Sequence, residues 1–259
     1  MEDILPPVVR DSKPFAWLMG CAHPLVHKFA SFRHHAHELN VEEYASLYRR
    51  IGAMKRVHEN TDNSAAVLEE ILKRVVPGRI IDVGCGTGYT LSFLMQRLQD
   101  NGSRFTGVDF QIDPRAREQL RNADLLEHDI LRLPVGDASF DTVLCSHTLE
   151  HILDVRAAVA ELRRICAKRL ILVVPREREG LYTFNPHFQF FPYVHSFLRV
   201  MIPLPKKYSC WNIGRDIIYI EDKDIAEASN DSDSVEPRRR TNAVSFERRK
   251  TYERGEVRL

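Results

Sequence analysis

The chain has 259 residues, a length that suits one large domain with appendages and that needs no disulfide or structural metal to bury a core. Its 37 Lys and Arg residues balance 36 Asp and Glu residues, which argues against a nucleic-acid binder that relies on overall charge. Five widely spaced cysteines without a C-x-x-C pair argue against a disulfide framework or a zinc module. Because no apolar run could span a bilayer and the N-terminus is acidic, we expect a cytoplasmic protein.

Residues 1–63 are expected to form a helical extension ahead of the main domain. Residues 41–54 place apolar side chains at a helical period, with basic residues left for solvent. A second helix is predicted from Ser64, whose hydroxyl can cap it, through Val75. The histidines of residues 23–37 lack the spacing of a metal motif, so we interpret them as part of a solvated helix surface.

From residue 79 onward, short β-branched runs alternate with helical segments. The predicted strands are residues 79–83, 105–108, 123–128, 140–145 and 169–174. The predicted helices between them run through Leu91–Leu98, open at Asp113-Pro114 and open at Asp154. This order predicts an α/β fold, with a doubly wound, mostly parallel sheet of the seven-stranded type and helices on both faces. A last strand at residues 216–220 is expected to close a hairpin that turns at residues 212–214.

The region of residues 176–215 departs from this alternation. Nine of the 23 aromatic residues of the chain fall within residues 182–211, and residues 195–202 resemble a short amphipathic helix. We expect this region to cover a bound substrate, since aromatic rings interleaved with polar groups can stack on a ring or sugar. Two alternatives stay open: a core patch that closes the sheet edge, and a peripheral membrane contact.

The C-terminal residues 223–259 form a charged tail. Residues 221–235 hold six acids and one base, whereas residues 236–259 hold eight bases and four acids. Such a composition buries too little apolar surface to order itself, so the sequence predicts disorder there.

A glycine-rich loop, Gly84-Cys85-Gly86-Thr87-Gly88, lies between a predicted strand and a predicted helix. Glycines let a ligand approach the backbone, and the helix start offers free N–H groups. Asp109 ends the next strand, where an acid typically binds ribose hydroxyls. Tyr89 replaces the last glycine of the dinucleotide fingerprint, and Asp82 would repel a pyrophosphate while suiting a cationic group. The loop therefore favours a nucleoside ligand that also carries an ammonium, a carboxylate and a sulfonium.

Four motifs in order resemble those of the class I S-adenosylmethionine-dependent methyltransferases, in their small-molecule, type 11-like branch. They are residues 82–88, Asp109, residues 128–141 and residues 145–151. The resemblance covers about residues 64–175, and we assign residues 64–222 to one S-adenosylmethionine-binding methyltransferase domain.

The resemblance implies how the methionine part of the cofactor S-adenosylmethionine is bound. Gly84, Cys85, Gly86 and Gly88 would pass beneath it, and Asp82 would lie near its ammonium group.

The resemblance also implies how the nucleoside part is bound. Asp109 would hold the ribose diol, with Phe110 beside the adenine. Asp129 would accept a hydrogen bond from the adenine amino group, and Ile130 would pack on the ring. Ser146 would lie near the methyl group, at the carboxyl end of the fourth strand.

His147 is the candidate general base, because its ordinary pKa suits deprotonation of a hydroxyl or amine; a purely packing role is the alternative. No amine-methylating Pro-Pro-Tyr motif, Pro-Cys nucleophile or catechol-type acidic cluster is present in the sequence. We therefore expect metal-independent, in-line transfer to a small molecule or to a glycan or lipid head group. Two other functions stay open: a non-catalytic S-adenosylmethionine-binding protein, and an RNA methyltransferase that uses the basic residues 238–240 and 248–250.

Overall fold

The structure is a computed structural model that describes residues 6–22, 38, 43, 46, 61–98, 101–180 and 187–223. The helix predicted over residues 41–54, the histidine-rich stretch 23–37 and the tail beyond Lys223 fall outside the described residues, apart from isolated positions. Within the predicted N-terminal extension, α1 (Pro7–Arg10) and α2 (Lys13–Ala22) are helical.

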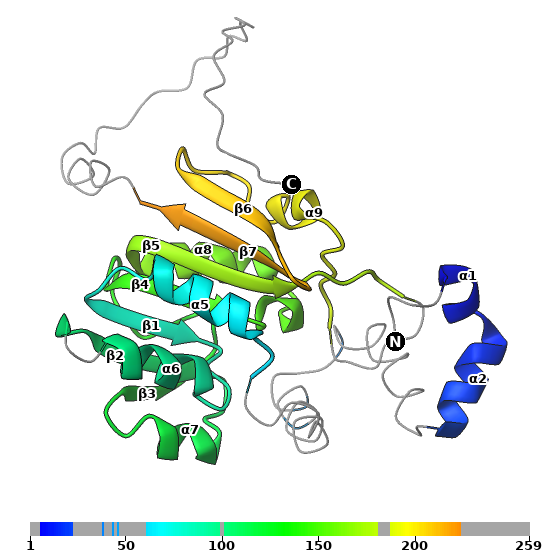
Figure 1. Cartoon of the computed structure of the whole chain (residues 1–259), viewed down its shortest axis with the longest axis horizontal. Helices are drawn as coiled ribbons and strands as arrows, with labels where there is room; N and C mark the ends of the chain where they lie inside the picture. Colours follow the sequence, from blue (N-terminus) through cyan, green and yellow to red (C-terminus); the bar gives the residue numbers. More distant parts are fainter. Residues whose placement is uncertain are drawn as a thin grey trace, which may run out of the picture.

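Seven strands form one sheet in the order β3-β2-β1-β4-β5-β7-β6 (Figure 1). The strands are β1 (Arg79–Val83), β2 (Arg104–Asp109), β3 (Asp124–Glu127), β4 (Phe140–Ser146), β5 (Cys166–Pro175), β6 (Tyr208–Ile213) and β7 (Asp216–Asp222). Strands β1 to β5 pair in parallel, and β7 runs antiparallel to both β5 and β6. The predicted sheet and its terminal hairpin are thus confirmed, and the chain reverses strand order between β1 and β4.

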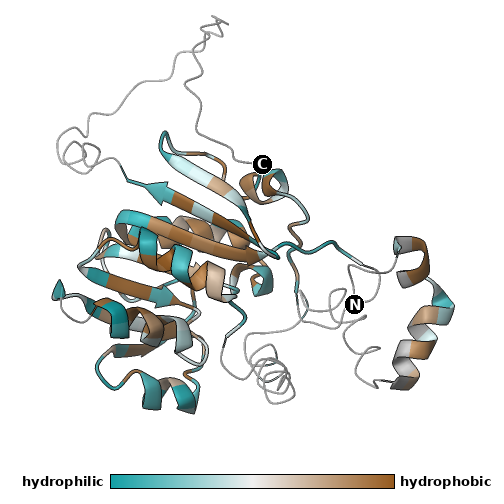
Figure 2. Ribbon diagram, in the orientation of Figure 1, coloured by the Kyte–Doolittle hydropathy of each residue, from teal (hydrophilic) through white to brown (hydrophobic). Residues whose placement is uncertain are grey.

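The helices cover both faces of the sheet, as predicted. One core cluster packs α5 (Ala65–Arg74), α6 (Tyr89–Leu98) and α7 (Pro114–Gln119) against one face, and a second packs α8 (Val155–Ile165) and α9 (Val194–Leu198) against the other. Figure 2 shows the apolar ribbon that runs along the central strands between these layers.

The predicted caps of three helices are present. Ser64 accepts from the backbone N–H of Val67, Asp113 from that of Arg115 and Asp154 from that of Ala157, at distances of 3.3, 2.8 and 3.0 Å. Each cap satisfies one of the N–H groups that a helix start leaves without an intrahelical partner.

Two predicted boundaries were wrong. Strand β5 begins at Cys166, directly after α8, because Cys166 already pairs with Phe140 and an irregularity in β4 follows that pair. Helix α9 covers only Val194–Leu198, so the predicted helix over residues 195–202 is too long. Pro203 disfavours a helical conformation in the residue before it, which limits how far the helix can continue.

Candidate functional site

The glycine-rich loop that follows β1 is held against the end of β2. Gly84 and Cys85 donate their backbone N–H groups to the carbonyl oxygen of Val108, at 2.7 and 2.9 Å. Gly86 donates its N–H to Oδ2 of Asp109, at 2.8 Å. The carboxylate predicted to bind ribose therefore also fixes the loop predicted to pass beneath the methionine part.

Gly84 and Gly86 have positive φ angles of +82° and +53°, but their surroundings differ. A Cβ on Gly84 would overlap the side chain of Thr148, so this position is a packing contact between the loop and the segment after β4. A Cβ on Gly86 would meet no heavy atom within 4 Å. The backbone at Gly86 therefore faces open space that a ligand could fill.

Two carboxylates, Asp82 and Asp109, lie beneath this loop on adjacent strands. Asp82 is only 2% exposed, and its burial and the nearby charge of Asp109 raise its pKa to about 7. Burial also raises the pKa of Asp109, although hydrogen bonds from the N–H groups of Gly86, Gln111 and Phe110 oppose that shift. A cationic ligand group at this place would relieve the cost of ionising the pair.

The residues predicted to hold the adenine lie after β2 and β3. Phe110 is 37% exposed, so one part of its ring is available for contact. Ile130 is buried, whereas Asp129 is exposed and accepts at Oδ1 from the N–H of Leu131, at 2.9 Å. That hydrogen bond uses one carboxylate oxygen of Asp129 to cap a turn.

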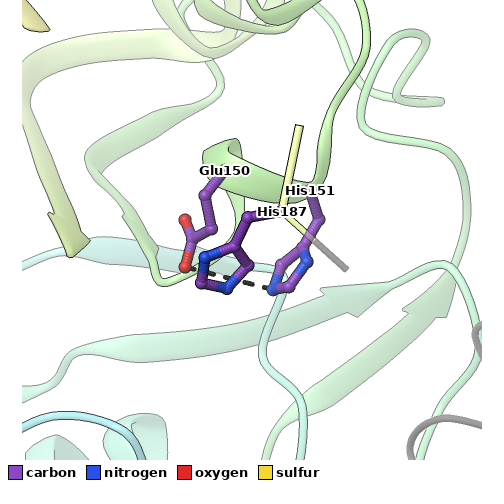
Figure 3. A group of neighbouring side chains, drawn as sticks. All are labelled: Glu150, His151 and His187. Carbon is purple, nitrogen blue, oxygen red and sulfur yellow. Dashed lines mark ion pairs between the residues drawn. The ribbon is translucent and has the colours of Figure 1, made fainter. Parts of the chain in front are cut away.

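The short helix η3 (Leu149–His151) follows β4 and carries a buried polar group. Glu150 is 1% exposed, and its carboxylate faces the imidazoles of His151 and His187 (Figure 3). Burial alone would raise the pKa of Glu150, but the neighbouring histidines lower it to about 2. His187 also contacts Glu177 after β5, with 2.6 Å between Nδ1 and Oε2.

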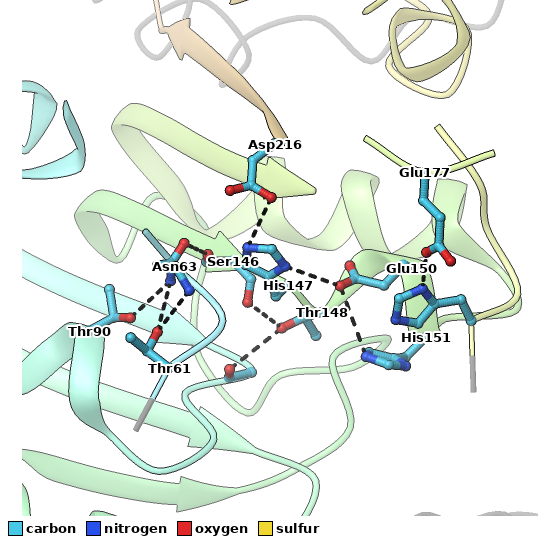
Figure 4. Close-up of polar contacts among 12 residues, drawn as sticks. Thr61, Asn63, Thr90, Ser146, His147, Thr148, Glu150, His151, Glu177 and Asp216 are labelled. Atoms are coloured by element: carbon cyan, nitrogen blue, oxygen red, sulfur yellow. Dashed lines mark hydrogen bonds and ion pairs between the residues drawn. The ribbon is translucent and has the colours of Figure 1, made fainter. Parts of the chain in front are cut away.

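His147 lies between two acids at the carboxyl end of β4 (Figure 4). Its Nδ1 is 3.7 Å from Oε1 of Glu150, and its Nε2 is 3.6 Å from Oδ1 of Asp216, the first residue of β7. Burial alone would lower the pKa of His147, but Glu150, Asp216 and Asp62 together raise it. Its buried Nε2 has no hydrogen-bond partner among the described residues.

Ser146 forms a hydrogen bond with Asn63, a residue that was not among the predicted site residues. Its hydroxyl donates to Oδ1 of Asn63 at 2.8 Å, and Nδ2 of Asn63 donates to the hydroxyl of Thr90 at 3.1 Å (Figure 4). Asn63 thereby joins the start of α5 to β4 and α6. In the sequence, the one feature that marks Asn63 is its place directly before the helix cap Ser64. That place is equally typical of a second capping residue, so it does not predict the hydrogen bonds to Ser146 and Thr90.

The aromatic region predicted over residues 176–215 is described except for residues 181–186. The rings of Phe191 and Phe197 lie in the core, whereas Tyr193 is exposed and stacks on His195 with 5.2 Å between ring centroids. The region therefore contributes to the core as well as to the surface. Among the described residues, no helix is both long and apolar enough to cross a membrane.

Comparison with known proteins shows which family shares this arrangement. A family described as a methyltransferase domain matches residues 81–174, the segment from β1 to β5. A demethylmenaquinone methyltransferase from Roseiflexus sp. (strain RS-1) is 32% identical over 141 residues, which are 51% of this chain and 58% of that protein. A malonyl-[acyl-carrier protein] O-methyltransferase from Serratia marcescens is 30% identical over 44% of this chain and 46% of its own length. The chain thus spans about half the length of these curated relatives.

The fold has a counterpart among solved structures. The PH0226 protein from Pyrococcus horikoshii superposes with a TM-score of 0.51 at 19% identity, over 66% of this chain and 99% of that one. The strand order, the loop after β1 and the match over residues 81–174 agree with the resemblance noted in the sequence. Residues 81–174 are thus similar to a methyltransferase domain family, in line with the resemblance of the sequence motifs to the class I S-adenosylmethionine-dependent methyltransferases.

Proposed function

We propose that this protein transfers the methyl group of S-adenosylmethionine to a small-molecule acceptor. The observation that carries the proposal is the convergence of Asp82, Gly86 and Asp109 at the carboxyl edge of β1 and β2, beside the reversal of strand order between β1 and β4. Ligands of open α/β sheets bind at such a reversal. Asp82 suits the ammonium group, the open face at Gly86 suits the methionine chain, and Asp109 suits the ribose diol.

Methyl transfer requires an acceptor aligned with the sulfonium methyl in a site that excludes water. In this proposal, Ser146 and His147 at the end of β4 face the methyl group from the neighbouring strand. His147 is the general base: its imidazole takes the proton of the acceptor, and the carboxylates of Glu150 and Asp216 stabilise the resulting imidazolium.

The acceptor class follows from the relatives and from the site together. The named relatives act on a quinone precursor and an acyl carrier protein, and another, from Cereibacter sphaeroides, is a phosphatidylethanolamine N-methyltransferase. Their acceptors share no single chemistry, so the proposal is limited to a small molecule or the head group of a lipid or glycan. The exposed pair of Tyr193 and His195 offers a stacking surface for such a group.

Transfer can be tested before the acceptor is identified. The full chain is incubated with S-adenosylmethionine carrying a labelled methyl group and with a small-molecule extract of cells. We expect a labelled product by mass spectrometry, together with S-adenosylhomocysteine. The His147→Gln variant serves as the comparison, and it should form product at least about tenfold more slowly because it lacks the base. If S-adenosylmethionine binds but no labelled product forms, the result would support a non-catalytic S-adenosylmethionine-binding protein. Label in RNA would support an RNA methyltransferase.

The raised pKa of Asp82 gives a proton-linked test of where the ammonium group binds. In the free protein this buried carboxyl titrates near pH 7, and a bound ammonium favours its ionised form. Binding of S-adenosylhomocysteine at about pH 6 should therefore release close to one proton, and the release should vanish by about pH 8.5. Calorimetry in buffers of different ionisation enthalpy measures it.

The Asp82→Asn variant should show no such proton release. The unaltered chain should not bind NAD, because the pyrophosphate of NAD would meet Asp82.

The raised pKa of Asp82 also fixes the sign of a stability effect in the free protein. Because the folded pKa lies above the ordinary 3.8, the contribution of Asp82 is fully present below that value and is lost as the pH rises through about 7. Release that persists in Asp82→Asn would contradict this assignment of the ammonium site.

A further inference from the structure

Three metal-ligating side chains meet next to the proposed methyl-transfer site. Glu150 and His151 come from η3, and His187 comes from the segment that follows β5 (Figure 3). One ligand atom from each lies within 4.8 Å of the other two. The three side chains are between 1% and 9% exposed, so this is a buried cluster and not a set of surface charges.

Backbone hydrogen bonds hold the two halves of the cluster together. The N–H groups of Phe188 and Gln189 both donate to the carbonyl oxygen of Glu150, at 2.7 and 3.1 Å. The side chain of Gln189 donates to the carbonyl oxygen of Ile152, at 3.0 Å. His187 is therefore fixed against η3 by the segment that immediately follows it, which preorganises the three side chains.

The orientation of His187 is that of a metal ligand. Its Nδ1 is 2.6 Å from Oε2 of Glu177, so Nε2 is the ring nitrogen that would serve as the metal ligand. A carboxylate that accepts from one ring nitrogen fixes the tautomer and directs the other nitrogen toward an ion, the usual arrangement around histidine ligands. Glu177 thus acts on the site through His187.

The carboxylate of Glu150 has an unused oxygen. Its Oε1 contacts His147 and His151 at 3.7 and 4.0 Å, whereas its buried Oε2 has no hydrogen-bond partner among the described residues. A buried carboxylate oxygen without a partner is costly, and coordination of a cation is one way to satisfy it. The surrounding acids Glu177 and Asp216 add further negative charge, which a divalent cation would offset.

We propose that Glu150, His151 and His187 bind a divalent first-row transition-metal ion. Two imidazoles and one carboxylate suit zinc, iron, cobalt or manganese better than magnesium, and three protein ligands leave coordination positions open. At ligand distances of about 2.0–2.2 Å, the ligand atoms of a tetrahedral site lie roughly 3.3–3.6 Å apart, so the most widely separated atoms would have to close by about 1.2–1.5 Å.

His187 lies 36 residues after His151 in the chain, and no sequence motif indicates that His187 reaches η3. The proposal therefore revises the expectation of a metal-independent site. It extends the proposed function, because an ion beside His147 would hold an acceptor oxygen and favour its ionised form. The cation site itself does not depend on methyl transfer, and it is tested by binding alone.

The full chain is treated with a chelator, desalted and titrated with Co²⁺, then separately with Zn²⁺ and Mg²⁺. We expect one Co²⁺ and one Zn²⁺ ion per chain by equilibrium dialysis, a visible absorption spectrum for the Co²⁺ form, and at least tenfold weaker binding of Mg²⁺. His187→Gln should weaken Co²⁺ binding by a hundredfold or more. Glu177→Gln, which weakens the contact that orients His187, should weaken Co²⁺ binding by roughly tenfold to a hundredfold.

His195→Gln is the matched control, since His195 is exposed and stacks only on Tyr193 among the described rings. It should bind Co²⁺ as the unaltered chain does. If the unaltered chain binds no ion at millimolar Co²⁺, the proposal fails. Equal affinity in His187→Gln, with an unchanged spectrum, would also overturn it. Calorimetry with S-adenosylhomocysteine on the same samples reports folding and cofactor binding, so failure of the metal site is distinguishable from failure of the proposed function.

Discussion

Replacing Asp109 with alanine should weaken the binding of S-adenosylhomocysteine by at least about tenfold. The substitution removes up to two charge-assisted hydrogen bonds to the ribose, each worth roughly 1.5–3 kcal/mol. It also removes the acceptor of the Gly86 N–H, so the loop loses the contact that holds it to β2. Isothermal titration calorimetry measures the dissociation constant directly.

The control for this prediction is Asp113→Ala, four residues further along the chain. Asp113 caps α7 and pairs with Arg115, so its loss should cost about 1 kcal/mol of stability and leave cofactor affinity unchanged. An unaltered dissociation constant in Asp109→Ala would show that the ribose lies elsewhere.

Alanine at Gly86 should weaken cofactor binding by at least about tenfold while the protein stays folded. The new Cβ meets no protein atom within 4 Å, so it would project into the space assigned to the methionine part. Gly214→Ala is a matched substitution, because Gly214 has a φ of +59°, also faces open space and lies in the turn between β6 and β7. Both variants should lose about 1–2 kcal/mol of stability from the positive φ, as measured by chemical denaturation.

Only Gly86→Ala should lose affinity, by at least about tenfold, for S-adenosylhomocysteine. Parallel losses in the two variants would attribute the effect to backbone strain. Full affinity in Gly86→Ala would mean that the ligand does not pass over this part of the loop.

The sequence predicted those parts of the structure that depend on local patterns. The alternation of strands and helices, the caps at Ser64, Asp113 and Asp154, and the loop at residues 84–88 all follow from residues close together in the chain. The family motifs marked the ends of β1, β2 and β4 and favoured a doubly wound sheet, but the spatial order of the strands came from the structure. The boundaries of β5 and α9 were wrong: the pairing of Cys166 with Phe140 extends β5 at its start, and α9 ends at Leu198, before the limit that Pro203 sets.

The contacts between distant segments were not predictable from local patterns. Asp216 reaches His147 because β7 inserts antiparallel beside β5, so that Pro175 pairs with Asp216. His187 reaches Glu150 through hydrogen bonds made by the residues that follow it. Neither contact produces a periodicity or a characteristic spacing in the sequence, because each depends on the path of the chain between consecutive strands.

The reversal of strand order between β1 and β4 divides the polar groups into two sets with different origins. The groups proposed to bind the cofactor come from the ends of β1 and β2 and from the segments after β1, β2 and β3, whereas Glu150, His187 and Asp216 come from segments after β4 and β5 and from the start of β7. A new acceptor specificity could therefore arise by exchange of the second set of segments alone. The half of the sheet that binds the cofactor would keep its residues, and a lineage of such proteins could diversify its products without rebuilding its methyl donor site.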